Sequence, residues 1–126
     1  MKKAIISEKA PKAIGPYSQA IKANNLLFLS GMLPIDPTTG EFASEFIEGQ
    51  TEQILKNIKA LLEDAGSGLD KVIKTTVFLS DMGYFAAMNG VYSAYFSEPY
   101  PARSAVAVKT LPKNALVEIE VIAFTE

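Results

Sequence analysis

Two short runs with β-strand character decide the fold of this chain: Pro101-Ala102-Arg103-Ser104-Ala105-Val106 and Val117-Glu118-Ile119-Glu120-Val121-Ile122. Successive side chains of a strand point to opposite faces of a sheet. In the second run the odd-numbered residues are all apolar, whereas the even-numbered face carries Glu118 and Glu120 between apolar ends. A strand face that meets water is normally more polar. We therefore expect both faces of this strand to be covered.

The two carboxylates on that face invite different interpretations. A covered carboxylate needs a partner or a raised pKa, and such groups are enriched at functional sites. For Glu118 the pattern favours a solvated position with lysine or arginine partners on a neighbouring strand. For Glu120, which lies deeper in the apolar run, a solvated position and a functional one are equally compatible with the pattern.

The composition excludes several classes of chemistry. The chain has 126 residues, no cysteine and no histidine. Disulfides, thiol nucleophiles, thiolate zinc sites and any histidine base are therefore excluded. No Asp-rich calcium loop is present, and we expect no metal site. The net charge of -2 gives no support for nucleic-acid binding.

The length and the N-terminal sequence limit the number of domains and the cellular location that we expect. Residues 1–126 are enough for one domain with a real core but not for a second one. The segment Met1–Ser7 has two lysines without a long apolar run after them, which argues against a signal peptide. No other run is long and apolar enough to span a bilayer. A cytoplasmic location is the prediction that follows.

The hydrophobic periodicity predicts the order β-β-β-α-β-α-β-β. A two-residue hairpin turn is expected at Asn24-Asn25, and Gly66 is placed to end the first helix. The second helix, capped by Ser80 or Asp81, should carry an apolar stripe that packs in the hydrophobic core. The predicted strands lie at 3–7, 17–23, 26–31, 72–79, 101–106 and 116–124, and the predicted helices at about 44–65 and 81–96.

This order predicts an α+β fold, in which two helices pack on one face of a single sheet. Two helices can cover only one sheet face, yet the last strand is apolar on both of its faces. The economical cover for the free face is the same face of another copy of the chain. A closed homo-oligomer is therefore expected, although its copy number does not follow from the pattern.

Several segments together resemble the RidA family, also called the YjgF or reactive-intermediate deaminase family. The resemblance extends over nearly the whole chain and is specific only in combination. The most recognisable pair is Pro101-Ala102-Arg103-Ser104 followed by Leu116-Val117-Glu118-Ile119-Glu120. The other matching segments are Ile14-Gly15-Pro16-Tyr17-Ser18-Gln19, Ser30-Gly31 and the 85–96 helix with Met88-Asn89 and Tyr92.

The resemblance implies a chorismate-mutase-like fold assembled as a homotrimer, with clefts between subunits. It implies hydrolysis of 2-imino acids, such as 2-iminobutanoate and 2-iminopropanoate, to 2-keto acids and ammonia without any cofactor. Enamine tautomers such as 2-aminoacrylate would also be substrates. The role would be to limit damage by these reactive metabolites.

In this resemblance the candidate catalytic residues are Arg103, Glu120 and Tyr17. A planar substrate carboxylate suits the bidentate guanidinium of Arg103. Glu120 would accept a proton from the attacking water, and partial burial would raise its pKa toward a useful value. Tyr17 would wall the pocket and offer its hydroxyl. The remaining candidate substrate-binding groups are the backbone N–H of Ala105 and residues Ser30, Gly31 and Asn89.

Two departures from the family pattern bear on function. Many relatives have cysteine where this chain has Ala105, so a thiol is not required if the chain is active. Many relatives also have glutamine where this chain has Met32, which alters the polarity expected of the pocket. A module that binds small carboxylates without chemistry is the alternative function, and a ribonuclease or translation inhibitor is a more remote one.

Overall fold

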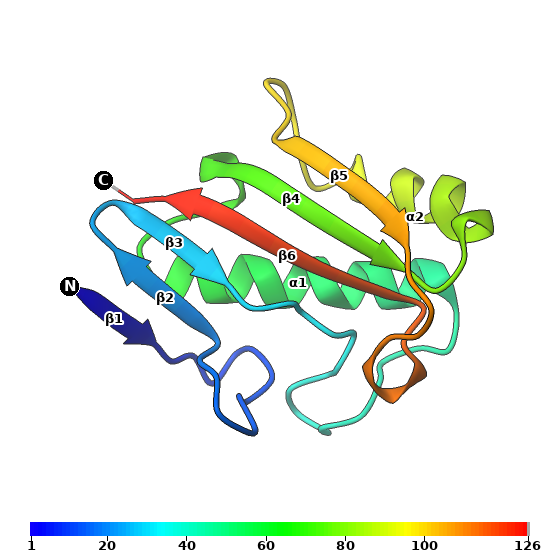
Figure 1. The fold of residues 1–126 in the computed structure, drawn as a ribbon, viewed down its shortest axis with the longest axis horizontal. Helices are drawn as coiled ribbons and strands as arrows, with labels where there is room; N and C mark the ends of the chain where they lie inside the picture. The colour runs from blue at the N-terminus through cyan, green and yellow to red at the C-terminus, as the bar shows by residue number, and fades with distance from the viewer. Residues whose placement is uncertain (126) are drawn as a thin grey trace.

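A computed structural model describes residues 1–125 and shows one mixed sheet with two helices (Figure 1). The predicted β-β-β-α-β-α-β-β order is confirmed. The strands are β1 (Lys2–Ile5), β2 (Ala20–Ala23), β3 (Leu26–Leu29), β4 (Val72–Leu79), β5 (Ala102–Ala107) and β6 (Val117–Phe124). The helices are α1 (Ile47–Asp64) and α2 (Phe85–Tyr92), with 3-10 turns at Leu69–Lys71, Met82–Tyr84 and Pro112–Asn114.

The last strand of the chain lies in the interior of the sheet. The strand order is β1-β2-β3-β6-β4-β5, so β6 is inserted between β3 and β4. All neighbours run antiparallel except β4 and β5, which are parallel. A parallel pair requires a crossover connection, and α2 supplies it here. β5 therefore forms one edge of the sheet and β1 the other (Figure 1).

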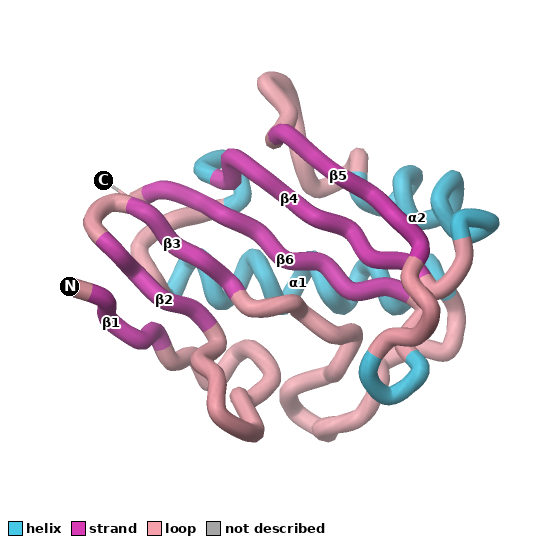
Figure 2. Tube along the Cα trace, viewed as in Figure 1, coloured by secondary structure: helices cyan, strands magenta, loops and turns pink. Residues whose placement is uncertain are grey.

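Both helices pack on the same face of the sheet, as predicted from the sequence (Figure 2). The core lies between this face and α1. The apolar side chains of β6 that point toward the helices are at most 2% exposed to solvent. They pack with fully buried residues of the α1 stripe, namely Ile54, Leu55, Ile58, Leu61 and Leu62. Alternation along the strand thus supplies one continuous core face.

The opposite face of the sheet, which we call the open face, carries no helix. On β3, Leu26 and Phe28 are 38% and 42% exposed, and Val106 on β5 is 46% exposed. Apolar side chains of β6 and β4 add to this surface and are half-buried, namely Phe78, Ile122 and Phe124. A contiguous apolar surface of this kind is typical of an interaction surface. The homo-oligomer predicted from the sequence would cover it and stays a prediction.

Most of the predicted turns and helix ends lie where the sequence placed them. The β2–β3 hairpin turns at Asn24 and Asn25, with Ala23 paired to Leu26 and Asn24 at a φ of 54°. Gly66 follows α1 with a φ of 81°, a conformation that glycine adopts without a steric cost. The start of α1 differs from the prediction. Ser44 accepts a hydrogen bond from the N–H of Phe46 at 3.0 Å, and the helix begins only at Ile47.

The second helix is shorter than its apolar stripe suggested. The Asp81 carboxylate accepts a hydrogen bond from the N–H of Gly83 at 2.7 Å, so Asp81 caps the 3-10 turn that leads into α2. The helix ends at Tyr92 rather than near Phe96. Beyond it, the N–H groups of Ala94 and Tyr95 donate to carbonyls three residues earlier. The chain thus tightens into turns before the prolines that lead it into β5.

One buried side chain makes several of the hydrogen bonds that hold the segment between β1 and β2. Gln19 is 8% exposed, and its Oε1 accepts from the N–H of Ser7 at 2.8 Å. Its Nε2 donates to the carbonyls of Ser7 at 3.0 Å and Pro11 at 2.7 Å. A buried amide with satisfied donors and acceptors fixes the loop it bonds to. The loop that carries Tyr17 is therefore anchored at its base.

Within residues 1–125, no helix is long and apolar enough to cross a membrane.

Candidate functional site

Arg103 lies in an aromatic cradle formed by α2. Its Nη1 donates a hydrogen bond to Asn89 Oδ1 at 2.6 Å. Its guanidinium carbon lies 4.7 Å from the centre of the Tyr92 ring and 5.4 Å from that of Phe85. Cation–π contacts at these distances orient a guanidinium without consuming its N–H donors. The arginine remains exposed, and Asn89 is the side chain that accepts a hydrogen bond from its guanidinium in the described residues.

Asn89 and Arg103 are candidate site residues in the sequence, whereas the aromatic residues of the cradle were expected to lie in the core. Phe85, Asn89 and Tyr92 stand at positions i, i+4 and i+7, so they share one helix face. That spacing was the available signal. An amide between two aromatic residues on one helix face indicates a surface that receives a polar group, and here that group is Arg103. Tyr92 belongs both to the cradle of Arg103 and to the hydrophobic core, because it is also a buried residue.

Ala105 lies two residues beyond Arg103 on the same face of β5. Only one side of β5 is paired in the single chain, since β5 is an edge strand. Half of the backbone groups of an edge strand point away from the sheet. The proposed use of a backbone N–H near Ala105 as a donor is compatible with this placement. Its contact with a ligand stays a prediction.

Ser30 and Gly31 lie where β3 separates from regular pairing with β6. Phe28 pairs with Ile122, and Met32 pairs with Ile119. Three residues of one chain segment (29–31) therefore face two residues of β6 (120 and 121), which defines a bulge. Bulges re-aim side chains and are frequent beside functional sites. They also explain why β3 ends at Leu29 rather than at the predicted residue 31.

The bulge carries Ser30 and places Gly31 against Glu118. Ser30 Oγ donates to the carbonyl of Ser18 at 2.6 Å, which ties the bulge to the loop ahead of β2. A Cβ placed on Gly31 would lie 2.5 Å from Glu118 Oε2 and 2.9 Å from its Cδ. Real Cβ atoms do not approach other atoms this closely. Glycine at position 31 is therefore what allows the Glu118 carboxylate to lie against the backbone.

Tyr17 stands at the rim of the same region. It is 53% exposed, and its hydroxyl accepts a hydrogen bond from the N–H of Ile14 at 3.3 Å. Tyr17, Ser30 and Gly31 line one small cavity of about 60 Å³. The structure thus brings these three predicted residues together. Glu120 borders a neighbouring hollow of about 220 Å³ on the open face, lined also by Phe28, Lys74 and Thr76.

The interpretation of Glu118 as a solvated residue with basic partners is wrong. Glu118 is half-buried, whereas Glu120 is exposed in the single chain. The ion pairs within residues 1–125 are Lys9–Asp64 and Lys56–Glu52, so neither glutamate of β6 takes part in one. Burial, together with the nearby charge of Glu120, raises the pKa of the Glu118 carboxyl above its ordinary value. The segment around Gly31 covers Glu118, which a strand pattern alone does not reveal.

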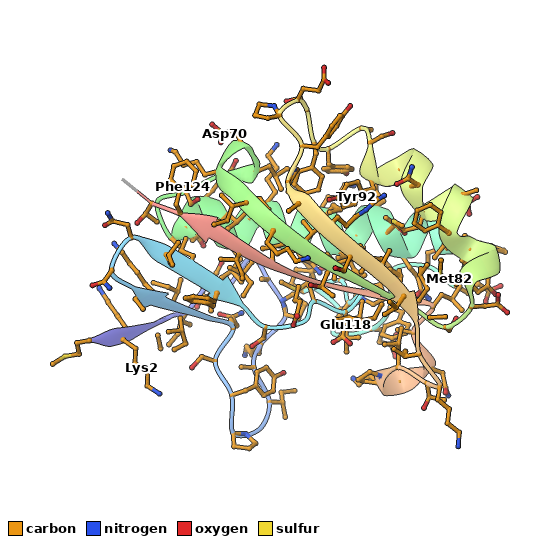
Figure 3. All side chains as sticks on the ribbon, turned by 45° about the horizontal axis from the view of Figure 1, so that its top comes forward. Lys2, Asp70, Met82, Tyr92, Glu118 and Phe124 are labelled. Carbon is orange, nitrogen blue, oxygen red and sulfur yellow. The ribbon has the colours of Figure 1, made fainter. Side chains whose placement is uncertain are left out.

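Within one chain, Arg103 and Glu120 point away from each other. Arg103 pairs with Thr75, which faces the helices, and Glu120 pairs with Thr76, which faces the open side. The predicted site residues thus form two groups. The arginine group contains Arg103, Asn89 and Ala105, and the carboxylate group contains Glu120, Ser30, Gly31 and Tyr17. Figure 3 shows the two regions at separate places, with Tyr92 marking the arginine cradle and Glu118 lying beside the carboxylate group.

The arrangement can serve anions on one side and proton transfer on the other. The arginine group presents a fixed cation with free donors, which suits a planar carboxylate. The carboxylate group presents Glu120, a serine and a tyrosine hydroxyl around small hollows. In the described part of the chain, no three carboxylate side chains come together in a way that would hold a metal ion.

We predict that Gly31→Ala lowers the stability of the protein by about 1 kcal/mol, because the new methyl group displaces the end of the flexible Glu118 side chain from its place against the backbone. Urea unfolding would measure the change. Adding Glu118→Ala in the same chain removes the atoms that collide and should recover most of the loss. A Gly31→Ala variant with native stability would show that the close contact does not constrain the bulge.

The raised pKa of Glu118 predicts a pH dependence of stability. A carboxyl whose folded pKa lies above its unfolded value binds more protons in the folded state, so its contribution to stability falls as pH rises through that interval. The interval begins near the ordinary value of 4.5. Glu118→Gln, which cannot ionise, should gain stability relative to the parent as pH rises from 4 to 7. Parallel urea titrations across this range test it, and a constant difference would contradict it.

The chain is similar to known proteins over almost its whole length. A protein-family model described as Endoribonuclease L-PSP matches residues 7–125. A RutC family protein of Pyrococcus horikoshii is 60% identical over 126 residues, which is 100% of both chains. Reactive Intermediate Deaminase A of Arabidopsis thaliana is 54% identical over 124 residues, covering 98% of this chain and 66% of the relative.

The fold comparison leads to the same group. The crystal structure of TdcF of Escherichia coli with bound serine superposes with a TM-score of 0.92 at 41% identity, covering 98% of this chain and 99% of that one. The sequence match extends over almost the whole chain, and the structural match does as well. On these grounds the chain belongs to the RidA/YjgF family, which the matching model describes as Endoribonuclease L-PSP.

Proposed function

We propose that this protein hydrolyses reactive 2-imino acids and their enamine tautomers to 2-keto acids and ammonia. The substrates would be small, such as 2-iminobutanoate, 2-iminopropanoate and 2-aminoacrylate. The observation that carries the proposal is the Arg103 guanidinium, which Asn89 and two aromatic rings hold in place while leaving it exposed. The cytoplasmic location and the absence of a cofactor stay predictions from the sequence and the resemblance.

Arg103 is the proposed anchor for the substrate carboxylate. One of its N–H groups is used by Asn89 Oδ1, and the others remain for a bidentate pair with two carboxylate oxygens. Every proposed substrate carries a carboxylate next to the imine carbon. Fixing that carboxylate would fix the position of the reacting carbon as well. The relative crystallised with bound serine supports this assignment, because serine carries the same α-carboxylate.

Glu120 is the proposed proton carrier. It would take a proton from a water molecule that attacks the carbon of the protonated imine, and return it to the amino nitrogen of the resulting carbinolamine. The C–N bond would then break while the hydroxyl becomes the carbonyl, and the hydroxyl proton would leave with ammonia as ammonium. An iminium carbon is already electrophilic. Positioning of water and substrate would therefore supply much of the acceleration.

The two groups of residues would form one site only when two copies of the chain meet. Arg103 and Glu120 are on opposite sheet faces of one chain, so one chain cannot present both to one small substrate. The exposed apolar residues of the open face favour a partner there. We propose a closed homo-oligomer, with three copies as the family resemblance implies. Each cleft would combine the arginine group of one copy with the carboxylate group of the next.

The alternative is a module that binds small carboxylates without chemistry. Such a module would need Arg103 but no proton carrier, so its binding would survive Glu120→Gln. A relative named Reactive Intermediate Deaminase A favours the enzyme. The description Endoribonuclease L-PSP keeps RNA cleavage as a further candidate. A salt-sensitive affinity for single-stranded RNA with cleavage that depends on Arg103 would favour that candidate over ours.

We predict that Arg103→Ala lowers imine hydrolysis by about 100-fold or more, because the substrate loses its charged anchor. Arg103→Lys should recover only part of the activity, since an ammonium group cannot form the bidentate pair. A threonine dehydratase would generate the imine in place while 2-oxobutanoate release is followed. Lys109→Ala, which removes an exposed positive charge just beyond β5, is the matched control. Equal rates for the parent and Arg103→Ala would refute the anchor.

We further predict that two inactive variants restore activity in mixed oligomers. Arg103→Ala and Glu120→Gln, co-expressed with different tags and purified through both, should regain activity although each alone is inactive. In a closed ring of three copies that contains both variants, one of the three clefts carries both intact groups. The same co-expression of two differently tagged Arg103→Ala chains should stay inactive. Mixed oligomers without activity would place both groups in the cleft from one chain.

A further inference from the structure

A buried pair of hydroxyl groups lies directly behind Arg103. Thr75 Oγ1 and the Tyr92 hydroxyl are 2.8 Å apart and share one hydrogen bond. Thr75 is fully buried and Tyr92 is 5% exposed. Thr75 is also the residue of β4 that pairs with Arg103 of β5. The bond therefore connects the strand beside Arg103 with the ring on which its guanidinium rests.

The core itself does not explain this pair. Two further residues of β4 that face the core, Val77 and Leu79, are fully buried and apolar. Valine has nearly the shape of threonine, and phenylalanine nearly that of tyrosine. Replacing both partners of a buried hydrogen bond by apolar groups of the same shape is close to neutral for stability. An apolar pair would serve the packing equally well, so the hydroxyls point to a role beyond packing.

The geometry around the ring suggests that role. Tyr92 packs against Phe96 with a ring-centre distance of 4.6 Å, and its ring centre lies 4.7 Å from the guanidinium carbon of Arg103. Phe96 contacts the ring but does not fix the hydroxyl end. The bond to Thr75 does so, because β4 is a rigid interior strand paired on both sides.

We propose that Thr75 and Tyr92 are positioning residues for Arg103, and that their hydrogen bond fixes the ring beneath the guanidinium and so the direction of its free N–H groups. Asn89 would fix one edge of the guanidinium and the ring would fix its plane. The inference rests on the proposed role of Arg103 as carboxylate anchor. It adds that anchor strength depends on two residues that no substrate touches.

The test compares the double variant Thr75→Val/Tyr92→Phe with the parent. We expect near-native stability in urea, because both hydroxyls leave together. We expect the Kd for 2-oxobutanoate, measured by calorimetry, to rise about three- to tenfold, the range of an oriented cation–π contact that is loosened. In the coupled assay, KM should rise by a similar factor while kcat changes little. Each single variant should lose stability in addition, since one buried hydroxyl is left without a partner.

Tyr95→Phe is the matched control. It removes a tyrosine hydroxyl that lies one turn later and bonds to Glu52 Oε1 at 2.5 Å, away from Arg103. Its Kd for 2-oxobutanoate should equal that of the parent. A double variant with parental Kd and reduced stability would show that the hydroxyl pair serves only packing, and would overturn the inference.

A second readout separates this inference from the proposed function. The Nε–H resonance of Arg103 in the ligand-free protein reports the ring beneath it, whatever the protein hydrolyses. We expect this resonance to move toward the position of a free arginine in the double variant and to stay in place in Tyr95→Phe. An unchanged resonance would overturn the positioning role. If the parent binds no 2-oxobutanoate but the resonance moves, the carboxylate anchor fails while the positioning role holds.

Discussion

The alternation of side chains across three neighbouring strands is the constraint on which the rest of this structure depends. Thr75 pairs with Arg103 on one side of β4, and Thr76 pairs with Glu120 on the other. Because the two threonines are consecutive, Arg103 and Glu120 emerge from opposite faces. A shift of one residue in either pairing would bring them to one face. It would also turn the apolar residues of that strand out of the core, so the core maintains the separation.

The separation gives each functional group a different environment. Arg103 lies on the helix-covered face, where α2 supplies an amide and two aromatic rings that orient it. Glu120 lies on the open face beside the bulge of β3, where Gly31 lets Glu118 approach the backbone. The site proposed here uses both environments through contact between copies. A fold with one covered face and one apolar uncovered face is suited to that use.

The helices and strands of this protein are more predictable from its sequence than the candidate site is. Periodicity placed all eight helices and strands in the correct order, because each one has an apolar face with its own repeat. It failed where local hydrogen bonds compete with the repeat. Ser44 bonds to the backbone before α1, and the stripe beyond Tyr92 continues into turns. The sequence pattern favoured a solvated Glu118 and left Glu120 open, but the bulge covers Glu118 while Glu120 is exposed. The apolar stripe of α2 was expected to lie in the core, because Phe85 and Tyr92 are apolar. No feature of the neighbouring sequence indicated that Arg103 would lie on these two rings.

The sequence by itself determined the α+β architecture, the helix-facing core of β6, the hairpin at Asn24-Asn25 and the membership in a family that the Arg103 and Glu120 segments identify. These features follow from side-chain periodicity and from short motifs, which are local properties of a chain. The tertiary structure alone decided which faces Arg103 and Glu120 take relative to each other, which glutamate is covered, and which ring supports the guanidinium. These depend on strand register and on packing between segments distant in sequence, such as Thr75 with Tyr92 and Gly31 with Glu118, and a one-dimensional pattern carries no record of either.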